Sequence, residues 1–208
     1  IWEESGLVEN IQVILLLFTI IIFLTIIKIL RNKNIPKFLK FATYIYLLCI
    51  SYYFFEEISW GQHIFQWQTT EFFKIYNNQK ETNLHNISNL FDQLPRIFLT
   101  IWCSLSFFIF KLLKNTSINE YYLNFILPKK KLFHISIILI LFFLPDFLID
   151  KLDLHPGYSF YSADITTSEI LDFISFNYIK LSELHELLFC IYLFYHAHFL
   201  RKYICLKT

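Results

Sequence analysis

Five apolar stretches divide the chain, and their lengths match helices that are buried or that cross a membrane. In the first stretch, seventeen uncharged residues precede Lys28, enough to cross about 30 Å of hydrocarbon if the lysine extends toward the headgroups. The middle three have fourteen or fifteen uncharged residues each, a length at which a buried soluble helix competes. We predict an all-α, polytopic transmembrane helical bundle of about five spans, at residues 11–28, 38–59, 96–113, 132–145 and 184–200.

The basic residues separate onto one side of this arrangement. Thirteen of the 18 lysines and arginines lie there, with Glu120 as the one acid, and the other side carries 16 of the 17 acids. Cytoplasmic loops of membrane proteins hold an excess of Lys and Arg near the span ends. The pattern therefore predicts an outer N-terminus and a cytoplasmic C-terminus. The thirteen are Lys28, Arg31, Lys33, Lys37, Lys40, Lys111, Lys114, Lys129, Lys130, Lys131, Arg201, Lys202 and Lys207.

Composition favours lipid as the surroundings of these helices. The hydrophobic share is 56%, with 25 Phe and 13 Tyr against 3 Gly, and the mean hydropathy is +0.47, beyond what one soluble core needs. No repeat or second soluble domain is evident, so residues 1–208 are predicted to form one transmembrane domain. Cys49, Cys103 and Cys190 lie within apolar runs and are expected to be buried as small hydrophobes, without disulfides. The basic residues follow topology rather than a recognition motif, which argues against nucleic-acid binding.

Two outer segments, residues 60–93 and 146–183, are too long to be simple connections. Aromatic side chains that suit the headgroup zone, such as Trp60, Trp67 and Tyr76, occur in the first. We expect both segments to fold onto the membrane surface, with at least one interfacial helix in the first.

The most informative polar stretch begins E-E-I-S-W-G-Q at Glu56. If the second span continues as a helix past Phe55, the side chains of Glu56, Ser59 and His63 share one face. Gly61 would then either allow another backbone to approach closely or break the helix.

Two further segments carry acids and histidines on the same predicted side. Glu81 and His85 are four residues apart, with Asn78 and Ser88 at compatible helical spacing, and such a pair can hold one metal ion or share a proton. On the fifth span Glu183 and Glu186 share one face. A second stripe there is formed by His185, Phe189, Tyr192 and His196.

Each of these groups of acids and histidines also has a simpler interpretation as solvated surface residues. Separately, His196 and His198 are expected to face headgroups or the inner surface. Convergence favours a shared site, because ionisable residues at a membrane boundary are costly and commonly functional. We therefore predict one outer polar pocket. Its members are Glu56, Glu57, Gln62, Glu81, His85, Glu183 and Glu186.

The motif resembles a family of uncharacterised bacterial multi-pass membrane proteins, in which E-E-I-S-W-G-Q precedes T-P-E-F and N-x-Q-x-E-T-N-L-H-N stretches. The likeness covers residues 56–86, with Thr70 where the family pattern has Pro. It implies a bacterial cytoplasmic (inner) membrane location. A fainter resemblance is to alkaline ceramidase-type membrane hydrolases, which use zinc near a bilayer face. Their H-x-x-x-H pair is not matched by His196 and His198, which lie two residues apart.

Three hypotheses of function follow. The first is metal-assisted hydrolysis or transfer on a lipid-like substrate, in which Glu81, His85 and Glu183 or Glu186 hold a divalent ion such as zinc. Glu57 would be the general base in the catalytic group Glu56, Glu57 and Gln62. The second is a non-enzymatic membrane subunit whose polar cluster is a structural hydrogen-bond network, with the bilayer and other membrane subunits as partners. The third is a small transporter or proton-coupled protein.

Overall fold

The structure, a computed structural model, describes residues 7–77, 80–84, 87, 89–113, 120–151 and 181–207. Within these residues all regular secondary structure is helical, which confirms the predicted all-α class. The second outer segment lies largely outside the described residues.

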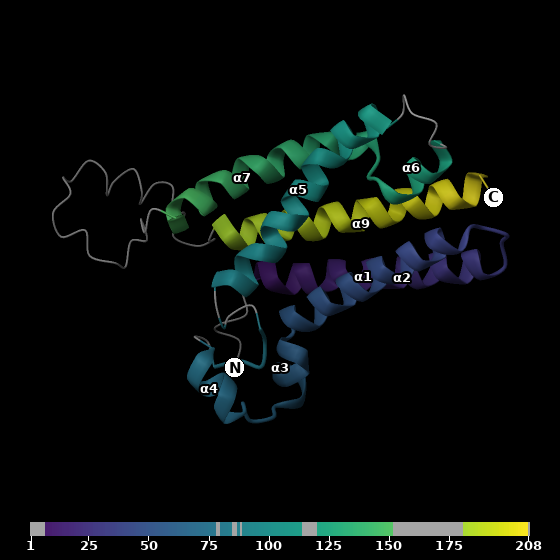
Figure 1. Ribbon diagram of the computed structural model, residues 1–208. Coiled ribbons are helices and arrows are strands. Elements are labelled where there is room, and N and C mark those ends of the chain that lie inside the picture. Colours follow the sequence, from purple (N-terminus) through teal and green to yellow (C-terminus); the bar gives the residue numbers. More distant parts are fainter. Residues whose placement is uncertain are drawn as a thin grey trace.

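Long helices occupy the apolar stretches (Figure 1). At 1.5 Å per residue they measure from about 29 Å to about 41 Å, close to or beyond the thickness of a hydrocarbon core. In chain order they are α1 (Leu7–Arg31), α2 (Lys37–Glu57), α5 (Asn89–Leu113), α7 (Phe133–Lys151) and α9 (Leu181–Lys207). Shorter elements connect them: η1 (Ser59–Gly61), α3 (Gln62–Phe65), α4 (Glu71–Tyr76), α6 (Glu120–Ile126) and η2 (Lys130–Leu132).

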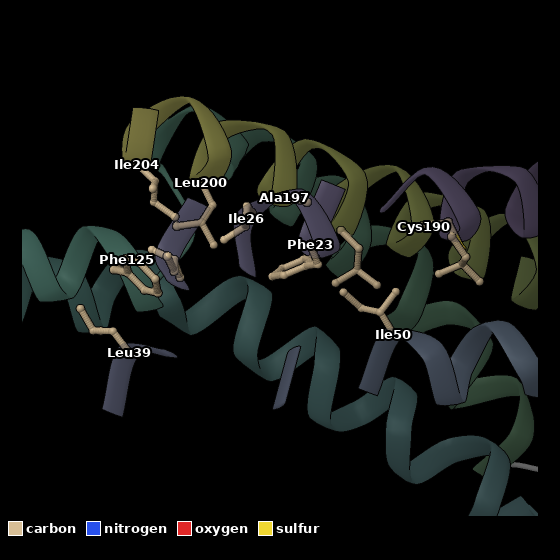
Figure 2. Packing of buried hydrophobic residues seen from close by; sticks show 12 residues of the cluster. Phe23, Ile26, Leu39, Ile50, Phe125, Cys190, Ala197, Leu200 and Ile204 are labelled. Carbon is tan, nitrogen blue, oxygen red and sulfur yellow. The ribbon is translucent and has the colours of Figure 1, made fainter. Parts of the chain in front are cut away.

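Helix α9 is the central element because it packs on both sides. It contacts α1 and α7, while α1 also packs on α2, and α5 packs on α7. One buried face of α9, including Cys190, Ala197 and Leu200, meets Phe23 and Ile26 of α1 (Figure 2). The second face, with Phe189 and Tyr192, meets Cys103 of α5, Leu132 of η2 and Leu139 of α7.

One backbone carbonyl group, that of Cys103, accepts hydrogen bonds between α5, α7 and α9. The carbonyl oxygen of Cys103 accepts hydrogen bonds from Ser106 Oγ at 2.9 Å, Ser136 Oγ at 3.0 Å and Tyr192 OH at 3.4 Å. These bonds join α5, α7 and α9 at one point, as polar side chains do between helices in membranes. Cys103 and Cys190 are buried free thiols as predicted, whereas Cys49 is exposed.

Within the described residues, α1 and α2 have the length and apolarity needed to cross a membrane. Their outward faces are apolar too. Ile14, Leu17, Phe18, Ile21 and Leu24 of α1 are exposed, opposite a buried stripe that includes Leu16, Phe23 and Leu30.

Helix α2 ends at Glu57 rather than continuing past it. Ser59, Trp60 and Gly61 all have positive φ, at 47°, 56° and 93°, which no α-helix allows. The expected common face of Glu56, Ser59 and His63 therefore does not form. Gly61 stands at the break, and a Cβ atom there would lie 3.1 Å from Cδ2 of Phe65.

The following loop contains the short helices α3 and α4, but residues 80–84 are not helical. Glu81 is therefore not part of a helix, although its spacing to His85 suggested one. Asn78, His85 and Ser88 lie outside the described residues.

Candidate functional site

The carboxylate of Glu56 is the anchor of the outer loop. Its side chain sits at the end of α2 and the residue is only 3% exposed. Oε1 accepts a hydrogen bond from the indole Nε1 of Trp60 at 2.7 Å, and Oε2 accepts one from the backbone N–H of Leu84 at 2.7 Å. Charged acceptors make the stronger hydrogen bonds, so this carboxylate ties the helix break to a segment 28 residues downstream.

Glu81 forms the second part of the same assembly. Its Oε2 accepts hydrogen bonds from Ser59 Oγ at 2.6 Å and from Asn83 Nδ2 at 2.9 Å. Asn77 Nδ2 in turn donates to the side-chain Oδ1 of Asn83 at 2.7 Å and to its backbone carbonyl at 2.9 Å. Asn77 and Asn83 are both buried, so their amides are satisfied inside the loop.

Gln62 supplies a third link. Its Oε1 accepts the backbone N–H of Thr82 at 2.7 Å, and its Nε2 donates to Thr69 Oγ1 at 2.7 Å. The Thr69 hydroxyl donates onward to the carbonyl of Lys80 at 2.6 Å. We call the side chains of Glu56, Ser59, Gln62, Asn77, Glu81 and Asn83 the loop clamp.

The loop clamp accounts for the strained backbone beside it. Left-handed conformations at non-glycine residues cost about 1–3 kcal/mol each and persist only where surrounding contacts hold them. Ser59 and Trp60 have this conformation, and both are hydrogen-bonded to clamp carboxylates.

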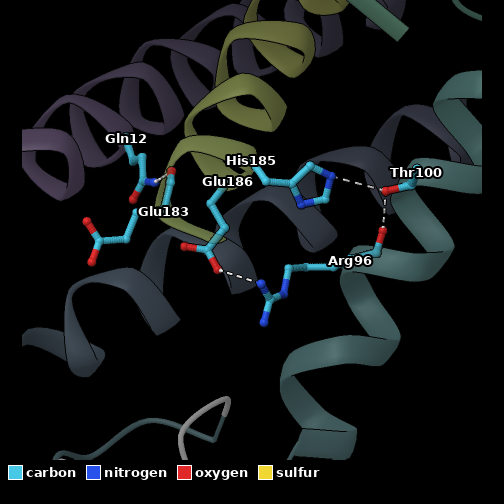
Figure 3. A network of polar contacts seen from close by, with 6 residues as sticks. All are labelled: Gln12, Arg96, Thr100, Glu183, His185 and Glu186. Atoms are coloured by element: carbon cyan, nitrogen blue, oxygen red, sulfur yellow. Dashed lines mark hydrogen bonds and ion pairs between the residues drawn. The ribbon is translucent and has the colours of Figure 1, made fainter. Parts of the chain in front are cut away.

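A second polar group lies between the helices, and Figure 3 shows it. Arg96 Nη1 of α5 lies 3.9 Å from Glu186 Oε1 of α9, with side chains 10% and 22% exposed. Gln12 of α1 donates from Nε2 to the backbone carbonyl of Glu183 at 3.0 Å. We call Gln12, Arg96, Thr100, Glu183, His185 and Glu186 the bundle network.

The protonation of His185 follows from its neighbour Thr100. The Thr100 hydroxyl donates to the carbonyl of Arg96 at 2.7 Å, so its single proton is used. Thr100 Oγ1 lies 3.4 Å from His185 Nε2, and a hydrogen bond across this contact takes its proton from Nε2. In the neutral ring this leaves Nδ1 as a bare acceptor, and that atom is buried without a hydrogen-bond partner in the described part of the chain.

Comparison with known proteins adds nothing to this geometry. No protein-family model, curated protein or solved structure matches the chain.

The predicted site residues fall into two places. Glu56, Gln62 and Glu81 belong to the loop clamp, and Glu186 and the backbone of Glu183 belong to the bundle network. Glu57 lies at the end of α2, beside Glu56, and is partly buried.

The predicted metal ligands are described only in part, since His85 lies outside the described residues. Among the residues that the structure does describe, no group of three or more His, Cys, Asp or Glu side chains could hold one metal ion.

Several residues of the bundle network were not predicted from the sequence as site residues. Gln12 and Thr100 are polar residues within apolar runs, and Arg96 stands at a predicted span boundary; these positions are the signals that could have identified them. The expectation for His196 was wrong. It is buried in the bundle, with ring centroids 5.4 Å from Tyr46 and 5.5 Å from Trp102, because it shares the second buried face of α9. His198 is exposed.

Proposed function

We propose that this chain is a non-enzymatic subunit of a bacterial cytoplasmic membrane, with about five spans, an outer N-terminus and a cytoplasmic C-terminus. In this proposal the loop clamp holds residues 58–77 and 80–84 as a fixed aromatic platform in the outer headgroup layer. The resemblance of residues 56–86 to bacterial multi-pass proteins is consistent with this location.

The outward faces of the other long helices support the five spans. Phe98, Ile101 and Leu105 of α5 are exposed, as are Ile137 and Leu141 of α7. Soluble proteins rarely expose apolar surface continuously along several helices. The basic residues, in contrast, gather at one end of the bundle, where α1 ends, α2 and α7 begin, and α9 ends.

One observation carries the structural role: donors from the same loop engage both carboxylate oxygens of Glu56. Buried carboxylates that fix a fold make contacts of this kind, with each oxygen bonded to a donor of the same chain.

The platform itself is rich in exposed rings. Phe65 and Trp67 stack with centroids 5.8 Å apart, and Phe72 and Tyr76 lie 5.0 Å apart; all four side chains are exposed, as is Trp60. Such rings are enriched at membrane interfaces, where one edge stays hydrated.

The platform can be tested by the depth of its tryptophans in vesicles. One variant retains Trp60 alone, a second retains Trp60 together with Trp67, and a third retains the bundle residue Trp102, with phenylalanine at the remaining tryptophan positions. Trp60 stays in both loop variants because its indole N–H donates to Glu56. We expect the emission of Trp60 and Trp67 to be quenched by lipids brominated near the glycerol backbone, because both rings lie in the headgroup layer. Trp102 serves as the deeper control. Strong quenching of Trp60 and Trp67 by aqueous iodide, with none by brominated lipid, would refute the platform.

Metal-assisted hydrolysis or transfer on a lipid-like substrate stays a prediction. Metal analysis of the purified full chain tests it, with Glu81→Gln and Glu186→Gln expected to lower the bound metal if the ligand set is correct.

A second candidate is a proton-coupled protein. It is favoured by two buried histidines on one face of α9, since His185 Nδ1 and His196 Nε2 lack hydrogen-bond partners among the described residues. Proton uptake into reconstituted vesicles should then fall to the protein-free level in His185→Phe and His196→Phe, but not in the exposed control His198→Phe. Equal uptake in all variants would eliminate this candidate.

A further inference from the structure

A cavity of about 450 Å³ lies at the basic end of the bundle, away from the loop clamp. It is open to the surface, and its lining residues come from the end of α5, from α6 and η2 with the turn between them, and from the end of α9. Figure 1 shows where these elements lie. Four lysines line it, and no Asp or Glu is among the lining residues. The four are Lys129, Lys130, Lys131 and Lys202.

Neighbouring side chains hold two of these lysines in place. Lys129 Nζ donates to Asn124 Oδ1 at 2.7 Å and stands 3.7 Å from the ring centroid of Tyr203. Lys131 Nζ lies 5.8 Å from the ring centroid of Phe199. Contacts of ammonium groups with aromatic faces are favourable, so these charges are positioned before any ligand binds.

The wall of the cavity opposite η2 is largely apolar. Phe199, Lys202, Tyr203 and Leu206 stand at positions i, i+3, i+4 and i+7 and therefore share one face of α9. Phe110 of α5 adds a further ring. A cationic rim beside an apolar wall suits a ligand with an anionic head and a hydrocarbon tail.

We propose that this cavity binds the phosphate-bearing headgroup of an anionic lipid of the cytoplasmic leaflet. Four ammonium groups around one cavity repel one another, and a phosphate relieves that repulsion while accepting their hydrogen bonds. Basic pockets between membrane helices on the cytoplasmic side recognise anionic headgroups in this way. The assignment to the cytoplasmic leaflet rests on the orientation proposed above, whereas the affinity of the cavity for an anionic headgroup does not.

The test uses the full chain in neutral detergent micelles, with lipid retention measured by native mass spectrometry. Titration with phosphatidylglycerol should give one retained lipid at concentrations where phosphatidylcholine is not retained. The double variant Lys129→Gln/Lys202→Gln should weaken phosphatidylglycerol binding by about 30-fold, from the loss of two lysines near the headgroup.

Matched variants separate the cavity from general basicity. Lys28→Gln/Lys37→Gln removes the same charge at the same end, from exposed lysines outside the cavity, and should retain binding. Lys129→Arg/Lys202→Arg keeps the charge and should retain most of it.

Three outcomes would overturn the proposal: equal weakening in the Lys28/Lys37 variant, equal retention of phosphatidylcholine, or competition by inorganic phosphate as effective as that by the lipid. The last outcome would identify a site for free phosphate. Because the assay needs no bilayer, its failure leaves the aromatic platform untouched, and failure of the tryptophan experiment leaves this site untouched.

Discussion

Replacing Glu56 with glutamine is expected to lower the free energy of unfolding by about 2 kcal/mol, the usual cost of losing a hydrogen bond to a buried charged group. Glutamine keeps the shape of the side chain but has only one acceptor oxygen. Its NH₂ group would face either the indole N–H of Trp60 or the amide of Leu84, and both of these are donors. Reversible denaturation of the full chain in mild detergent measures the change.

Glu71→Gln is the matched control, because Glu71 is an exposed acid in the same loop, at the start of α4. Its effect should be within about 0.5 kcal/mol, as for most surface substitutions. A catalytic Glu56 predicts a different result: active-site acids are often held at a cost to stability, so Glu56→Gln would then leave stability unchanged or raise it.

Replacing Arg96 with leucine is expected to destabilise the bundle by about 2–3 kcal/mol. Removing one partner of a buried pair leaves the other charge poorly compensated and costs about 3–5 kcal/mol. The expected value here is lower because the ion pair measures 3.9 Å and Glu186 is 22% exposed. The same denaturation assay measures it.

The double variant Arg96→Leu/Glu186→Gln should recover about half of that loss, since the uncompensated carboxylate is gone. Arg201→Leu, at an exposed position near the end of α9, controls for the loss of a guanidinium. Strict additivity of the two substitutions would show that Arg96 and Glu186 do not stabilise each other.

Much of the helical architecture was predictable from the sequence. Apolar stretches fix where helices form, because backbone groups in an apolar setting must be paired within the segment. The stripe of His185, Phe189 and Tyr192 on α9 also marked a real face. What the sequence did not indicate was that α9 also buries a face with Cys190, Ala197 and Leu200 and is therefore central. Apolar and small side chains of this kind suit contact with lipid as well as contact with another helix, so their pattern does not distinguish the two.

The polar site was less predictable. Helical spacing suggested that Glu56, Ser59 and His63 act together, but the chain breaks at Ser59 and the clamp is built across a non-helical loop. Two of its strongest bonds use backbone N–H groups, those of Thr82 and Leu84. Any residue except proline can supply such a donor, so residue identity carries no signal for it.

Amide hydrogen exchange at Leu84 is the most direct test of the loop clamp, because the Leu84 N–H donates to Glu56 Oε2. In the membrane-embedded full chain, we expect slow exchange at Leu84 that becomes about 30-fold faster in Glu56→Gln. This factor corresponds to a local opening that is easier by about 2 kcal/mol. Glu71→Gln should leave that rate unchanged. Exchange at Leu84 as fast as in an unstructured peptide, or unaffected by Glu56→Gln, would contradict the loop clamp.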